Sequence, residues 1–195
     1  MEKNKKLSRQ ELKRLVEKSI IRDEEKKRIK WSATSSTKEV LRALNTSLNG
    51  LDPMQISRSR MLYGKNQTTS EKKKSLIQMI LESLDQPTSY VVRKHENLIN
   101  ILSKEIVVGD IVHLAEGDVV PADLRVIEAE GLRVDQTVIS KDDTLVKKTA
   151  EICNKEAENI ADYSNILLMG TSIVAGCAEA VVVSVGDHTI MGTLS

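Results

Sequence analysis

The chain has 195 residues and a net charge of +1; 40% of its residues are hydrophobic, although Phe is absent and Trp occurs once. A near-neutral chain does not favour nucleic acid, so we expect no nucleic-acid partner. The length suits one or two domains, with cores built mainly from Val, Ile and Leu. Cys153 and Cys177 lack the spacing of a metal site or a disulfide framework, and no apolar run is long enough to span a bilayer.

The first segment, residues 1–35, is basic at its start. Residues 1–30 contain 12 Lys or Arg and 6 Asp or Glu, and Leu12, Leu15 and Ile20 recur at helical spacing. Two interpretations stay open. One is a solvated, partly ordered helical tail. The other is an amphipathic basic helix that lies on an anionic membrane surface.

The second segment is predicted to be helical. Ser36 and Glu39 have the spacing of a capping box, and the Asn49-Gly50 pair tolerates the positive φ that ends a helix. Asp52-Pro53 starts another helix, because Asp is a good N-cap and Pro suits the first helical position. A third helix is expected over residues 70–86, where leucine and isoleucine again recur at helical spacing.

The third segment changes character, because short apolar runs bounded by glycine and charged turns predict strands. The expected strands are residues 90–93, 111–114, 124–128, 132–135, 166–169, 171–174 and 178–185, with Gly131 and Gly176 as breaks between neighbours. This spacing favours a β-sandwich or a distorted jelly roll. The expected fold class is therefore α+β, divided into a tail (1–35), a helical region (36–87) and a β-rich domain (88–195) on which the N-terminal helices pack.

The β-rich segment also contains four ordered sequence blocks. They are Val108-Gly109-Asp110-Ile111-Val112, residues 116–125 (EGDVVPADLR), Val134-Asp135-Gln136, and residues 165–176 with Met169-Gly170-Thr171 at their centre. Together they resemble the actuator domain of P-type cation-transporting ATPases. Two earlier blocks, Leu44-Asn45-Thr46-Ser47 and Tyr63-Gly64-Lys65-Asn66, are similar to the cytoplasmic stretch that precedes the first transmembrane helix of these pumps. Their spelling and the Met-Gly-Thr block are most similar to the magnesium-importing branch.

The resemblance implies a part of a pump at the cytoplasmic face of the cell membrane, whose partners are the phosphorylation and transmembrane domains. The family's Asp-Lys-Thr-Gly-Thr phosphorylation motif and a phosphate-binding glycine loop do not occur in this sequence. The chain itself is thus expected to use no cofactor and not to hydrolyse ATP, whereas a full-length pump would use Mg²⁺ and ATP. In the family, two transmembrane helices precede the actuator core, but residues 67–107 here are polar, so we expect the isolated chain to be soluble in the cytoplasm.

The family's catalytic Thr-Gly-Glu loop, whose glutamate activates water for hydrolysis of the aspartyl-phosphate, falls on Ser140, Lys141 and Asp142. Serine keeps a hydroxyl, but lysine replaces the glycine that allows close approach, and aspartate is one methylene shorter than glutamate. A carboxylate misplaced by about 1 Å can cost on the order of 10²-fold in rate. We therefore expect an impaired loop, with an adjusted position of Asp142 or substitution by Asp143 as the alternatives.

Other reactive side chains favour structural roles. His113 is expected to be a half-buried strand histidine, because no second metal ligand has matching spacing. Cys153 is expected to be exposed and Cys177 to lie in the core.

Two functions remain from the sequence. The first is the actuator domain of a P-type cation pump, with Mg²⁺ as the expected cation, that couples dephosphorylation to transmembrane helix movement. The alternative is a standalone, non-catalytic actuator-like protein that regulates or binds a membrane pump.

Overall fold

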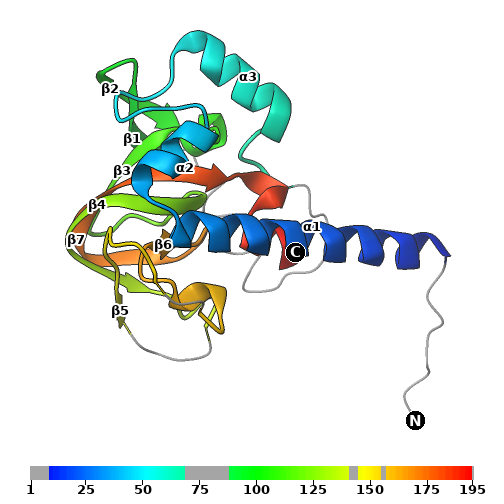
Figure 1. Ribbon diagram of the computed structural model, residues 1–195. Helices are drawn as coiled ribbons and strands as arrows, with labels where there is room; N and C mark the ends of the chain where they lie inside the picture. The colour runs from blue at the N-terminus through cyan, green and yellow to red at the C-terminus, as the bar shows by residue number, and fades with distance from the viewer. Residues whose placement is uncertain (1–8, 69–87, 141–144, 155–156, 195) are drawn as a thin grey trace.

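A computed structural model describes residues 9–68, 88–140, 145–154 and 157–194 (Figure 1). Its helices are α1 (Arg9–Thr34), α2 (Thr37–Ala43), α3 (Pro53–Tyr63) and α5 (Ile190–Leu194), and its 3₁₀ turns are η1 (Ser103–Glu105), η2 (Ile160–Asp162) and η3 (Gly186–His188). Its strands are β1 (Ser89–Lys94), β2 (Asn97–Leu102), β3 (Ile111–Ala115), β4 (Asp123–Asp135), β5 (Leu145–Lys147), β6 (Ile166–Leu167) and β7 (Ser172–Ser184). The predicted α+β class is confirmed. The helix expected over residues 70–86 lies outside the described residues.

The starts of α2 and α3 follow the predicted capping chemistry. The Ser36 side chain accepts a hydrogen bond from the Glu39 amide while the Glu39 carboxylate accepts one from the Ser36 amide, which together satisfy two free N–H groups at the helix start. Asp52 and Gln55 repeat this arrangement before α3. The predicted end of the first helix is wrong, because α2 ends at Ala43 and not at Asn49-Gly50.

Helix α1 joins the rest of the protein through its C-terminal half. The helix projects away from the sheet at its N-terminal end (Figure 1), whereas Ile29 and Ala33 are fully buried and Ser32 has no exposed surface. The Arg28 guanidinium also lies 5.4 Å from the centre of the Tyr63 ring, which links α1 to α3. A solvated tail therefore does not describe residues 25–33, which form part of a packed interface.

The strands form one antiparallel sheet in the order β2-β1-β3-β7-β4-β5, with β6 paired to β4. The sequence reasoning missed β2. It is the second arm of a hairpin whose turn places His95 and Glu96 at φ of 48° and 69°, a conformation usually signalled by Asn-Gly. Within the described residues, no helix is long and apolar enough to cross a membrane.

The predicted breaks at Gly131 and Gly176 are wrong, because β4 and β7 are continuous 13-residue strands. Their pairing contains register shifts, including one between Glu130 and Arg133. A Cβ on Gly176 would lie 2.3 Å from the Glu130 carbonyl oxygen. The two glycines thus allow the long strands to cross closely at a bulge, and they do not end the strands.

Alternate residues of β7 supply two separate cores. Ala178, Ala180 and Val182 face the main core, which is formed by strands β1, β3 and β4 and the loops between them. Val181 faces α2, and Val183 faces α1 and α5. This period of two explains why α1, α2 and α5 pack on one face of the sheet while its largest apolar cluster lies on the other.

Candidate functional site

The loop in which the sequence predicts the catalytic trio joins β4 to β5. The two strands pair antiparallel, with Asp135 opposite Leu145, so the loop forms the end of a hairpin. Its first half is a tight turn: the Thr137 amide donates to Asp135 Oδ1, and the Ser140 amide donates to the Gln136 carbonyl at 2.8 Å. Ser140 is half-buried at the end of this turn. Lys141 and Asp142 lie outside the described residues, so the predicted trio stays a prediction.

Two side chains fix the base of this loop by donating to the same carbonyl group, that of Ala161. Gln136 Nε2 donates to the Ala161 carbonyl at 3.1 Å, and Lys148 Nζ donates to it at 2.9 Å and to the Tyr163 carbonyl at 2.8 Å. Lys148 is 1% exposed, and burial lowers its pKa to about 8. Both ends of the hairpin loop are thus tied to the η2 segment.

Two of the family-like blocks build the same turn. In Val107–Asp110 and in Ala115–Asp118, the aspartate amide donates to the first residue's carbonyl, and its carboxylate accepts from the first residue's amide. The glycine at the third position, Gly109 or Gly117, has φ of 93° or 95°, as a type II turn requires. These Gly-Asp pairs have a structural role at the ends of β3.

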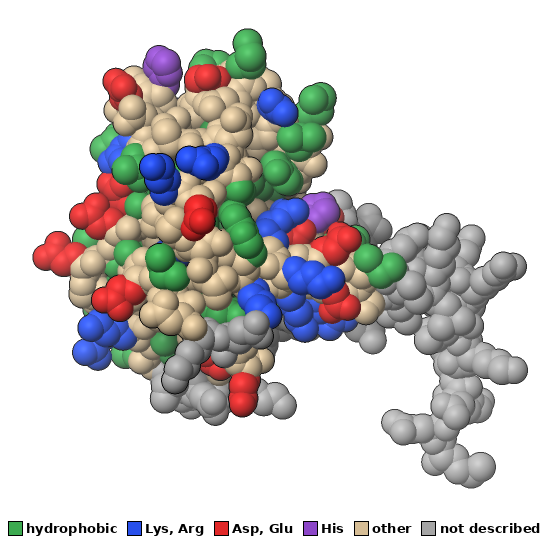
Figure 2. Space-filling view, viewed as in Figure 1, with side chains coloured by type: hydrophobic (Ala, Val, Ile, Leu, Met, Phe, Trp, Pro, Cys, Tyr) green, Lys and Arg blue, Asp and Glu red, His purple; other side chains and the backbone are tan. Residues whose placement is uncertain are grey.

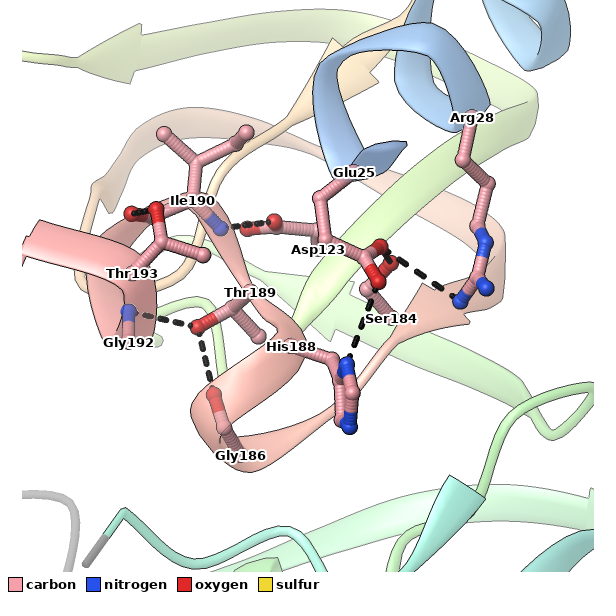
Figure 3. A network of polar contacts seen from close by, with 10 residues as sticks. All are labelled: Glu25, Arg28, Asp123, Ser184, Gly186, His188, Thr189, Ile190, Gly192 and Thr193. Carbon is pink, nitrogen blue, oxygen red and sulfur yellow. Dashed lines mark hydrogen bonds and ion pairs between the residues drawn. The ribbon is translucent and has the colours of Figure 1, made fainter. Parts of the chain in front are cut away.

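Asp123 connects the long strand β4 to the C-terminal helix. Its Oδ1 accepts a hydrogen bond from the Met169 amide at 2.8 Å and its Oδ2 accepts one from the Ile190 amide at 2.6 Å. Asp123 has no exposed surface, and burial raises its pKa to about 7, against the opposing effect of the two amide donors. Figure 3 shows this carboxylate beside the start of α5.

Arg125, two residues further along β4, connects the same strand to α1. It is fully buried, and its guanidinium donates to the carbonyls of Ser32, Val126 and Ala150. Burial lowers its pKa to about 10. The Asn165 side-chain amide adds a second bond to this helix end, donating to the Ala33 carbonyl at 2.8 Å. The last carbonyl groups of a helix have no N–H donors within the helix. The bonds to Ser32 and Ala33 satisfy two such carbonyl groups at the C-terminal end of α1.

Glu25 continues the network about two turns before Ser32 on the same face of α1 (Figure 3). Its carboxylate accepts from the Ser184 hydroxyl at 2.8 Å and lies 3.2 Å from His188 Nδ1 and 3.4 Å from Arg28 Nη1. Glu25 is 2% exposed, and a buried carboxylate requires such partners. Helix α1 is therefore attached to the end of β7 and to η3.

A third part of the chain meets this corner at Asn66. Its side-chain amide donates to the carbonyls of Ser103 and Pro121, and its Oδ1 accepts from the Gly186 amide at 3.0 Å. A Cβ on Gly186 would lie 2.5 Å from the Gln67 carbonyl oxygen, so the two backbones are in direct contact. Helix α1, residues 65–67 and helix α5 are thus all fixed around the end of β7.

The remaining reactive residues have structural surroundings. His113 is half-buried on β3 as predicted, 3.4 Å from Glu179 Oε1, and burial lowers its pKa. The part of the chain that the structure describes contains no cluster of three or more metal-ligating side chains. The cysteine predictions are wrong: Cys153 is half-buried and contacts Ser164 Oγ at 3.3 Å, whereas Cys177 is exposed because it faces outward from β7.

Comparison with known proteins agrees with this framework. Residues 83–195 match the family described as P-type ATPase actuator domain, and residues 32–92 match the family described as cation transporter/ATPase, N-terminus. The chain belongs to the P-type ATPase actuator-domain family. The actuator match covers more than half of the chain and contains the whole β-sheet, including Asp123, Arg125 and the loop at Ser140.

Individual relatives of the actuator domain include subunits of sodium pumps. The chain is 33% identical over 125 residues to "Sodium/potassium-transporting ATPase subunit alpha" of Drosophila melanogaster, and 34% identical over 125 residues to the alpha-2 subunit of Bos taurus. It is 33% identical over 126 residues to the alpha-4 subunit of Rattus norvegicus. Each match covers 64% of this chain and 12% of the relative, so the chain spans only a small part of the length of these proteins.

Several anchors of this actuator domain were missed by the sequence reasoning. Lys148 directly follows Lys147 at the end of β5, and such a pair of lysines usually faces solvent. Glu25 lies between Ile21 and Ile29 at spacings of four residues, so it falls on the apolar face of α1. A charge on an apolar helical face was the available signal that Glu25 has a buried partner.

Proposed function

We propose that this actuator domain works as a rigid lever within a P-type cation pump, where it transmits rotation to membrane-spanning helices. The carrying observation is that α1, residues 65–67 and α5 are fixed around one corner of the sheet by buried hydrogen bonds. Because these hydrogen bonds are buried, the three chain segments must move together with the sheet as one rigid body. The proposed partners are the phosphorylation and transmembrane domains of the pump, and the proposed location is the cytoplasmic face of the membrane.

The loop between β4 and β5 is proposed to be a poor catalyst of dephosphorylation. The sequence resemblance assigns the family's dephosphorylation loop to the hairpin that carries Ser140, and this assignment is the support for a proposed role at the aspartyl-phosphate. Replacement of the family's glycine by Lys141 and of its glutamate by Asp142 changes both the approach to the phosphoryl group and the reach of the carboxylate. We infer that this loop hydrolyses the aspartyl-phosphate slowly. The domain then keeps its mechanical role in the pump although its loop contributes little to catalysis.

The proposed transported cation is Mg²⁺, on the spelling of two sequence blocks. Thr46 of the first block donates from its hydroxyl to the Gly109 carbonyl at 2.8 Å, and Gly170 of the second donates to the Val120 carbonyl. The first block therefore links the N-terminal region to the β-rich domain, whereas the second joins two loops within that domain. Measuring which cation stimulates the ATPase activity of the full-length pump, and which cation it transports, tests this proposal. Stimulation by Na⁺ or Ca²⁺ without transport of Mg²⁺ would contradict it.

A regulatory actuator-like protein is the second candidate, and the change at Lys141 favours it. A domain that docks on a pump does not itself need a hydrolytic glycine-glutamate pair. Co-purification of the chain with an intact pump, together with a change in that pump's turnover, would support regulation. Turnover that is unaffected by a saturating amount of the chain would contradict it.

The isolated chain offers a direct test of dependence on a pump. We expect no heat of ATP binding in titration calorimetry and no hydrolysis of acetyl phosphate, an acyl phosphate like the family's phosphoenzyme. Clear ATP binding or acyl-phosphate turnover by the purified chain would overturn the proposal that it acts only as part of a larger machine.

A further inference from the structure

A groove of about 400 Å³ runs between helix α1 and the segment 157–163. One wall is basic: Arg22, Lys26, Lys27 and Lys30 all line it from α1. Figure 2 shows Lys and Arg side chains gathered along the described part of α1, with acidic side chains among them. Ile190 is the one residue that the groove's lining shares with the network of Figure 3.

Three of the four cations in this wall are not neutralised by any described side chain. Arg22, Lys26 and Lys27 form no ion pair with any described side chain, unlike the neighbouring Arg28, which contacts Glu25 at 3.4 Å. Glu158 is the single acidic side chain among the groove's lining residues. A concave surface lined by one sign of charge concentrates ligands of the opposite sign.

The floor of the groove is apolar. Ile139 and Ile160 are half-buried there, and Leu168 and Ile190 are buried beneath them. The floor is held in place by Lys148, which donates to the carbonyls of Ala161 and Tyr163. The site therefore presents a fixed apolar strip beside a row of cations.

We propose that this groove binds an acidic segment of a partner protein, with carboxylates toward α1 and a leucine-like side chain on the floor. A peptide fits this shape because it can place an apolar side chain inside a cleft while its charged neighbours stay at the rim. A lipid headgroup layer is flat and does not enter a cleft. It would also meet Asp23 and Glu24, which are exposed on the same helix.

The location gives the contact a consequence for the loop. Ile139 lies in the groove and directly precedes Ser140 in the turn that closes on Gln136. A bound segment would contact the base of the β4–β5 hairpin and limit its movement. This inference does not rest on the proposed pump function, because it concerns binding by the chain itself.

The test uses the full chain and a fluorescein-labelled peptide that repeats Glu-Leu-Glu-Glu-Leu-Glu, with binding followed by fluorescence anisotropy. The variant Lys26→Glu changes the groove, and its side chain is exposed, so the fold should persist. Lys104→Glu is the matched control, because Lys104 is an exposed lysine outside the groove. A second peptide with serine in place of leucine tests the apolar floor.

We expect the wild-type chain and Lys104→Glu to bind the leucine peptide equally, and Lys26→Glu to bind it about tenfold more weakly. The serine peptide should bind more weakly than the leucine peptide. Equal loss in Lys104→Glu would overturn the groove in favour of overall charge. No binding of the leucine peptide would also overturn it, as would equal affinity for both peptides. The proposal also fails if phosphatidylglycerol vesicles bind the chain and compete for Lys26 and Lys27 while the peptide does not.

Discussion

Replacing Asp123 by alanine should loosen the attachment of α5 and destabilise the whole actuator domain. The carboxylate accepts two buried backbone hydrogen bonds, from the amides of Met169 and Ile190. Each buried N–H group that is left without an acceptor costs about 1–3 kcal/mol, so Asp123→Ala should lower the free energy of unfolding by about 2–6 kcal/mol. Since domains of this size are stable by only about 5–15 kcal/mol, the upper part of that range would leave little folded protein.

Urea denaturation followed by the fluorescence of Trp31 measures this effect, because the single tryptophan lies on α1. Asp118→Ala is the matched control: its carboxylate accepts one amide hydrogen bond, from Ala115, in an exposed turn. We expect that variant to lose less than about 1 kcal/mol. A loss from Asp123→Ala of under about 0.5 kcal/mol, or no larger than that of Asp118→Ala, would refute the role assigned to Asp123.

Three further predictions concern buried charge and glycine. Because the folded pKa of Asp123 is raised from 3.8 to about 7, the part of the free energy of unfolding that depends on its protonation is fully present below about pH 4 and is lost as pH rises through about 7. Asp123→Asn should lack this loss when urea denaturation is repeated across that pH range, and parallel pH profiles would contradict it. Lys148→Met should cost about 1–3 kcal/mol at pH 7, because it removes two buried hydrogen bonds and, among the described residues, leaves only the Gln136 side chain on the Ala161 carbonyl and the Ile166 amide on the Tyr163 carbonyl. The variant should also lack the gain in stability expected as pH rises from about 8 to 10.5, and a neutral effect would show that the two bonds contribute little. Gly176→Ala should lower the midpoint of thermal unfolding more than Gly117→Ala does. Both glycines have positive φ, but only a Cβ on Gly176 would meet backbone atoms within 4 Å. Equal midpoints for the two variants would argue against the close strand crossing.

Local chemistry was predicted well where it depends on neighbouring residues. The caps at Ser36 and Asp52 were predicted from sequence because each is a contact across three residues. Gly176 was misread as a strand end, because a glycine that permits a crossing looks the same in sequence as one that ends a strand. The difference depends on β4, which is 46 positions away in the Glu130–Gly176 contact.

The site shows the same division between local and distant information. The position of the loop after β4 followed from the family-like blocks, and Ser140 does lie in the turn after that strand. The fixing of that loop by Lys148 could not be predicted, because its partners at Ala161 and Tyr163 are carbonyl groups with no residue signature. Burial of Glu25 likewise depends on Ser184 and His188, which are far along the chain.

The most direct test of the account is the decay of the aspartyl-phosphate in a pump that carries this actuator domain. Residues 88–195 would replace the corresponding segment of a full-length P-type ATPase, once with the native loop and once with Ser140→Thr, Lys141→Gly and Asp142→Glu together. We predict that both chimeras form phosphoenzyme, and that the native loop releases phosphate on the order of 10²-fold more slowly than the restored loop. Equal decay in the two chimeras would contradict the claim that an intact actuator framework here carries an impaired catalytic loop.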